Sequence, residues 1–183
     1  VERRFRLCDA LRGVGPPLID SFMKFYGLSR AQAETAVVYF REYFKDKGIF
    51  ENVPYEGIKE LLSDLKAAGK TLVVATSKPE LFARQILEHF EMTAYFTYVA
   101  GANFDETRTL KSEVIRYALD SIGLADVSTC VMVGDREHDI IGAKAFGMHS
   151  VGVLYGYGSR EEFEKAGATH IAESVEALRG LIV

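Results

Sequence analysis

The fold of this chain is decided by the stretch Val131-Met132-Val133-Gly134-Asp135-Arg136-Glu137-His138-Asp139. An apolar run stops at Gly-Asp and a second carboxylate follows at Asp139, so the sequence predicts a buried strand that delivers two acids to its carboxyl end. Parallel α/β sheets bind ligands outside the carboxyl ends of their strands. Acids at that position favour a metal-dependent phosphate enzyme as the first hypothesis.

Helix and strand patterns alternate on both sides of this stretch. We expect further strands near residues 71–75, 98–100, 150–154 and 170–172, and helices over residues 56–68, 80–90, 112–122, 140–146 and 161–165. From about Pro16 to Asp46 the pattern is helical throughout. The sequence therefore predicts a small helical unit, residues 1–52, followed by a doubly wound, mostly parallel α/β unit, residues 53–183.

Composition argues against several classes of protein. The net charge is −4 and charges of both signs are interleaved, so we expect no nucleic acid partner. No apolar run approaches the roughly 20 residues of a membrane span, and no signal-type stretch follows Val1, so we expect no membrane partner. Cys8 and Cys130 lie far apart in the sequence, which favours a reducing, cytoplasmic location.

Asp135 and Asp139 are the candidate Mg²⁺ ligands, because this ion prefers one or two carboxylates together with waters and substrate phosphate. Each residue has an alternative role. Asp139 is also suited to be the N-cap of a helix that begins at Ile140, and Asp135 is suited to a solvated turn. Their joint position at a strand end favours the metal site.

Three more polar residues stand where strands end or helices begin. Thr76 can turn its hydroxyl and the following N–H groups toward an anion, or it can be a strand-end residue without a ligand. Ser77 has capping-box spacing to Glu80, so we expect it to cap the next helix. Lys111 opens a helix, where a cation opposes the helix dipole; it is either simply solvated or it neutralises a nearby phosphate.

Other catalytic classes lack their motifs. The four histidines show neither i,i+4 pairing nor neighbouring cysteines, so no zinc site is predicted. The sequence has no Gly-x-Ser-x-Gly elbow and no Gly-x-Gly-x-x-Gly opening a helix. A serine hydrolase and a dinucleotide-binding protein are therefore poorly supported.

The order Thr76, Lys111, Asp135, Asp139 at successive strand ends resembles the haloacid dehalogenase (HAD) superfamily of Mg²⁺-dependent phosphohydrolases. Four segments are similar to its phosphoglycolate-phosphatase-like branch: residues 15–18, 75–79, 133–143 and 152–158. The resemblance implies a HAD-like (Rossmannoid) doubly wound parallel sheet with a small helical cap. Residues up to about Phe50 would form that cap, which closes over the substrate.

The resemblance also implies roles for individual residues. Thr76 and Ser77 would bind the transferring phosphoryl group and Lys111 would neutralise it. Asp135 would ligate Mg²⁺ and Asp139 would support that ligand. In the cap, Lys24 and Arg41 are candidates to meet an anionic leaving group, although such cations more often solvate helix faces.

The chain departs from the family pattern at the nucleophile. The family carries it in an Asp-x-Asp-Gly-Thr motif at the end of the first core strand, and this sequence contains no such motif. Neither Asp9 nor Asp20 follows an apolar strand, so neither is a substitute. The first core strand is therefore absent from the chain as given. Its absence would leave two interior strand edges unpaired, so we expect a segment of a longer polypeptide.

We expect the parent protein to hydrolyse a small phosphate monoester, such as phosphoglycolate, a nucleotide or a sugar phosphate, with Mg²⁺ and through an aspartyl-phosphate. The chain alone, without that nucleophile, is expected to be inactive. Two alternatives stay open: a phosphotransferase or mutase of the same fold, and an inactive module that binds Mg²⁺ or phosphate. The expected partner is a small phosphorylated metabolite, and the protein is expected to be a monomer or homodimer.

Overall fold

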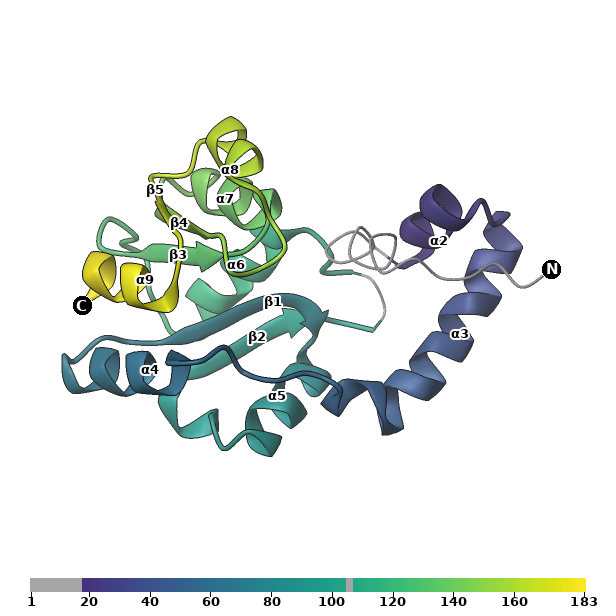
Figure 1. Cartoon of the computed structure of the whole chain (residues 1–183), viewed down its shortest axis with the longest axis horizontal. Coiled ribbons are helices and arrows are strands. Elements are labelled where there is room, and N and C mark those ends of the chain that lie inside the picture. The colour runs from purple at the N-terminus through teal and green to yellow at the C-terminus, as the bar shows by residue number, and fades with distance from the viewer. Residues whose placement is uncertain (1–17, 105–106) are drawn as a thin grey trace. The chain divides into compact units, whose positions relative to one another are not determined.

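The structure is a computed structural model that describes residues 18–104 and 107–183. The hypotheses that concern Cys8, Asp9 and residues 15–17 lie outside these residues. The chain divides into two compact units, Val1–Asn52 and Val53–Val183, and each is described by itself (Figure 1). Among the described residues, no helix is both long and apolar enough to cross a membrane.

The described part of the first unit is helical. It contains α2 (Leu18–Tyr26), α3 (Arg30–Asp46) and the short 3-10 helix η1 (Gly48–Phe50). The turn between α2 and α3 passes through Gly27 at a φ of +66°, a value that favours glycine. Ser29 then caps α3, and its hydroxyl and the Gln32 side chain form a complete capping box.

The second unit contains parallel strands in two groups. In the first, β1 (Val73–Pro79) pairs with β2 (Tyr98–Ala102). In the second, the order is β3 (Val131–Gly134), β4 (His149–Val153) and β5 (His170–Ala172). Every pairing is parallel, which confirms the predicted α/β class.

Helices connect these strands and cover them. They are α4 (Ile58–Ala67), α5 (Glu80–His89), α6 (Lys111–Ser121), α7 (Glu137–Lys144), α8 (Arg160–Ala166) and α9 (Val175–Ile182), with the 3-10 helix η2 (Thr93–Tyr95) after α5. Helix α9 was not predicted from the sequence, although the Ser174 hydroxyl caps it by accepting the Ala177 N–H.

The start of α5 corrects one prediction. Its N-cap is Pro79 rather than Ser77, and β1 continues through Ser77 because Pro79 still pairs with Ala102. Pro79 has a φ of −51°, which already suits the approach to the first helical turn. The predicted capping role of Ser77 is therefore wrong, and its side chain is exposed.

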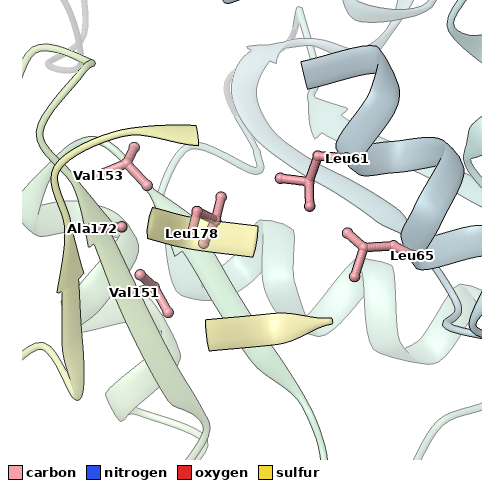
Figure 2. Close-up of a cluster of buried hydrophobic side chains, with 6 residues drawn as sticks. All are labelled: Leu61, Leu65, Val151, Val153, Ala172 and Leu178. Carbon is pink, nitrogen blue, oxygen red and sulfur yellow. The ribbon is translucent and has the colours of Figure 1, made fainter. Parts of the chain in front are cut away.

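Three apolar clusters hold the α/β unit together. The first joins α4 and α9 to β4 and β5; Figure 2 shows Leu178 of α9 between the leucines of α4 and the valines of β4. The second packs Val114 and Ala118 of α6 against Ala100 of β2. The third packs Ile140 of α7 against residues of α8. Helices therefore lie against both strand groups.

The two strand groups do not form one continuous ladder within the described residues. There β1 pairs only with β2, and β3 pairs with β4 on one side. Residues 73–76 of β1 and 132–134 of β3 are only half-buried, whereas residues 99–102 of β2 and 150–153 of β4 are buried. Within residues 18–104 and 107–183, β1 and β3 therefore each have one edge without a strand partner.

A glycine pair tests the packing of β4. A Cβ on Gly152 would lie 2.5 Å from Cγ of Phe163, which is fully buried. Gly152→Ala should therefore lower the free energy of unfolding by about 1–3 kcal/mol. The control is Gly180→Ala in α9, where nothing lies within 4 Å, and a gain of about 0.5–1 kcal/mol is expected. Urea denaturation of both variants measures the difference, and equal effects would contradict this packing.

Candidate active site

A largely buried ammonium, that of Lys111, lies at the centre of the candidate site. Nζ of Lys111 lies 2.7 Å from Oδ1 of Asp139 and donates a hydrogen bond to the carbonyl oxygen of Ala75 at 3.0 Å. The Lys111 and Asp139 side chains are 11% and 7% exposed. Ala75 belongs to β1 and Asp139 to α7, so this lysine links the two strand groups.

Local sequence explains how Lys111 reaches that position. Oε2 of Glu113 accepts the N–H groups of Thr109 and Leu110, both at 2.9 Å, which starts α6 at Lys111. On the facing helix α7, a Cβ at Gly142 would lie 2.8 Å from Cγ of Lys111. Glycine at that position therefore lets the lysine stem pass between α6 and α7.

Asp139 is fixed through both of its carboxylate oxygens. Oδ1 pairs with Lys111, and Oδ2 accepts the backbone N–H of Arg136 at 3.1 Å. Because α7 begins at Glu137, Asp139 is the third residue of the helix, and the alternative role as N-cap of a helix beginning at Ile140 is wrong. Its contacts suit a residue that supports the site through Lys111.

Asp135 lies directly after β3 and is enclosed by the glycine-rich turn after β4. Its Oδ2 accepts the Tyr157 N–H at 3.2 Å. A Cβ on Gly156 would clash with the Asp135 side chain, and one on Gly158 would lie 2.5 Å from its carbonyl oxygen. The two glycines therefore allow the turn to wrap this aspartate.

Two tyrosine rings accompany Asp135. Tyr55 and Tyr155 meet edge to face, with centroids 5.0 Å apart. Burial, then electrostatic interaction with Tyr55 and Asp135, raises the pKa of Tyr155 to about 12. Burial is also the main cause of the raised pKa of Tyr55, followed by Asp135. Both hydroxyls therefore stay protonated at neutral pH and can donate hydrogen bonds.

Thr76 lies near the end of β1, one residue after the carbonyl that Lys111 contacts. Its Oγ1 accepts the Lys78 N–H at 3.1 Å, so the hydroxyl hydrogen can still be donated to an anion. Lys78 is a feature that the sequence analysis missed, although a lysine two residues after a strand-end threonine was a visible signal. Its burial lowers the pKa of its amine.

A continuous chain of contacts thus connects most of the predicted site residues. From Thr76 and its neighbour Ala75 the contacts pass through Lys111 to Asp139, and Asp139 packs on Gly134, which precedes Asp135. Lys24 and Arg41 belong to the other unit, on exposed positions of α2 and α3, and their predicted roles stay predictions.

Asp135 is the residue best suited to hold a hard cation. Its Oδ1 accepts no hydrogen bond within residues 18–104 and 107–183, and magnesium needs few protein carboxylates. Across those same residues, no group of three His, Cys, Asp or Glu side chains converges on one point. The residues present therefore fit Mg²⁺ in part, through one carboxylate oxygen, and the other ligands would be water, phosphate or groups outside this set.

Comparison with known proteins agrees with this geometry. Residues 7–153 match the family described as haloacid dehalogenase-like hydrolase. A 5'-nucleotidase of Pseudomonas aeruginosa is 46% identical over 92% of this chain and 76% of its own length. The tyrosine-protein kinase PtkA of Mycobacterium tuberculosis is 39% identical over 91% of this chain, which spans 57% of the kinase.

Solved structures of similar fold and sequence include phosphatase-like proteins and PtkA. The crystal structure of a predicted phosphatase from Clostridium acetobutylicum matches with a TM-score of 0.91 and 46% identity, over 100% of this chain and 83% of that one. The structure of PtkA from Mycobacterium tuberculosis matches with a TM-score of 0.80 and 37% identity, over 100% of this chain and 83% of that one. Both likenesses extend over the helical and the α/β units.

The ion pair between Lys111 and Asp139 should be costly to break on one side. Asp139→Leu leaves a largely buried ammonium without its counter-charge, so the free energy of unfolding should fall by about 3–5 kcal/mol. The double variant Lys111→Met with Asp139→Leu removes both charges and should recover most of that loss. Urea denaturation measures all three proteins.

The matched control is the exposed pair between Arg160 and Glu173, whose side chains are 50% and 74% exposed. Glu173→Leu should change the free energy of unfolding by less than about 1 kcal/mol, because water screens such pairs. An Asp139→Leu cost no larger than that of Glu173→Leu would contradict the importance of the buried pair.

Proposed function

Because the chain belongs to the haloacid dehalogenase-like hydrolase family, we propose that the protein hydrolyses small phosphate monoesters. The observation that carries this proposal is the Lys111 ammonium. It has three N–H donors, of which one meets Asp139 and one meets the Ala75 carbonyl. The third is left for a phosphate oxygen near the end of β1.

The residues of this chain would have different roles in phosphoryl transfer. Lys111 neutralises charge on the phosphoryl group, and its pairing with Asp139 keeps the ammonium from turning away. The Thr76 hydroxyl donates to another phosphate oxygen. Positioning and charge stabilisation of this kind supply most of the catalysis in phosphoryl transfer.

Magnesium would bind at Asp135 and would neutralise further charge on the phosphate when it is present. Such a cation would be needed because Asp135 and Asp139 are both acidic, and a phosphate dianion beside them adds more negative charge than Lys111 can offset. Asp139 would act indirectly, through Lys111.

The proposed route is covalent and passes through an aspartyl-phosphate. The carboxylate attacks phosphorus as the P–O bond to the alcohol breaks, and a general acid, which would also lie outside the 183 residues, protonates the leaving oxygen. Water then hydrolyses the aspartyl-phosphate to inorganic phosphate and the free carboxylate. The attacking aspartate would lie outside the 183 residues, because they contain no Asp-x-Asp-Gly-Thr motif. We therefore propose that the chain by itself is inactive.

The names of two relatives support a proposal about the substrate class. The Pseudomonas aeruginosa relative is named for 5'-nucleotides, and a relative from Neisseria meningitidis, 34% identical, is named phosphoglycolate phosphatase. We propose a small cytoplasmic phosphate ester of this kind, with the protein as monomer or homodimer. Lys24 and Arg41 of the helical unit are the proposed contacts to an anionic leaving group.

One observation favours a second candidate function. The relative from Mycobacterium tuberculosis is named a tyrosine-protein kinase, so a phosphotransferase of the same fold remains a proposal beside the phosphatase. Both activities use the same anion site and differ in whether water or another hydroxyl accepts the phosphoryl group. The ratio of inorganic phosphate released to phosphorylated acceptor, with ATP and a tyrosine peptide present, separates the two.

Asp135→Asn tests the proposed activity. Loss of the carboxylate charge should lower kcat/KM for nucleoside monophosphates and phosphoglycolate by roughly 100-fold, because the proposed contact between Asp135 and Mg²⁺ is weakened. Colorimetric release of inorganic phosphate by the natural polypeptide, with Mg²⁺ and again with EDTA, is the measurement. Asp126→Asn, an exposed loop change, should leave the rate unaltered.

Two results would contradict the proposal. A wild-type rate that does not change when EDTA removes the cation would exclude the role given to Mg²⁺. Turnover by the 183-residue chain alone, assayed in parallel, would exclude a nucleophile that lies outside it.

A further inference from the structure

The loop after β3 is held by a residue from a distant helix. Arg136 is the N-cap of α7 and has no acceptor atom in its side chain, so it cannot satisfy the first N–H groups of that helix. Glu162 of α8 does so instead: its Oε1 accepts the Glu137 N–H at 2.7 Å. A carboxylate at this point also complements the helix dipole of α7.

The same carboxylate oxygen binds the neighbouring residue. Oε1 of Glu162 accepts from Nε of Arg136 at 2.9 Å, and both side chains are 19% exposed. Glu162 therefore binds Arg136 and Glu137, the two residues that directly follow Asp135. Partial burial makes these charge-assisted bonds stronger than similar bonds at the surface.

The position of Glu162 is itself set by the glycine-rich turn. The Ser159 hydroxyl accepts the Glu162 N–H at 3.1 Å and so caps α8. Ser159 directly follows Gly158, and the same turn supplies the Tyr157 N–H that holds Oδ2 of Asp135. One segment, residues 156–162, thus contacts the Asp135 carboxylate at one end and the backbone beside it at the other.

From this geometry we propose that Glu162 is a positioning residue for Asp135. It clamps residues 136 and 137 to α8 and thereby keeps Oδ1 of Asp135 turned away from the Tyr157 amide and open to a cation. The inference rests on the proposed function for its catalytic consequence, but the clamp itself is a property of the protein without metal. Partners of this indirect kind typically change metal affinity by about 10–100-fold when removed.

Two variants of Glu162 and one control separate the clamp from general stability. Glu162→Ala removes both hydrogen bonds, whereas Glu162→Gln keeps an acceptor for the Glu137 N–H and loses the charge that faces Arg136. Glu161→Gln makes the same chemical change on an exposed neighbour in α8. All are made in the natural polypeptide.

The first readout uses no metal. Amide hydrogen exchange at Glu137 and Tyr157 should be faster in Glu162→Ala, by about tenfold or more, and unchanged in Glu161→Gln. The second readout is the dissociation constant of Mg²⁺ by calorimetry, which should rise about tenfold in Glu162→Ala and by less in Glu162→Gln. The Mg²⁺ concentration for half-maximal phosphatase activity should rise in parallel, with a smaller change in KM.

A merely structural role would lower Tm without changing Mg²⁺ affinity in the folded variants, and that result would overturn the inference. Unchanged exchange of the Tyr157 amide would overturn it equally. If Glu162→Ala does not fold, Glu162→Gln decides with the same readouts. If the wild type has no phosphatase activity, the proposed function fails, and the metal-free exchange at Tyr157 still decides whether Glu162 is a clamp.

Discussion

The Lys111 ammonium is the constraint on which the rest of the α/β unit depends. A charge that is 11% exposed must be paired, and the available partners come from both strand groups: a carbonyl of β1 and a carboxylate of α7, the helix that follows β3. Pairing this charge therefore fixes α6 against α7 and brings the end of β1 toward the end of β3. The contacts that would form the proposed anion site also connect the two strand groups.

The open edges of β1 and β3 give this link added importance. Within the described residues, the two strand groups share no ladder of hydrogen bonds, so apolar packing and the Lys111 contacts join them. Apolar packing is non-directional and tolerates small shifts, whereas an ion pair with a 2.7 Å separation does not. The site geometry accordingly depends on polar contacts more than on the core.

Sequence reasoning found the elements whose signals are local. The strand that ends at Gly134 and the lysine at the start of α6 follow from the hydrophobic period of the sequence. The start of α7 was misplaced because Arg136 is a poor cap by itself, and its partner Glu162 is distant in sequence. Ser77 was misread because pairing of Pro79 with Ala102 overrides a local capping pattern. Contacts between residues far apart in sequence, such as the clamp on the Asp135 loop, leave no local pattern.

The measurement that tests this account most directly is a titration of the ¹⁵N-labelled natural polypeptide with inorganic phosphate in the presence of Mg²⁺. If the strand ends and Lys111 form an anion site, amide signals of Ser77, Lys78 and residues 135–137 should shift together and saturate, and Lys111→Met should weaken the binding. Absence of saturable shifts at these residues, or shifts confined to the helical unit, would contradict the account.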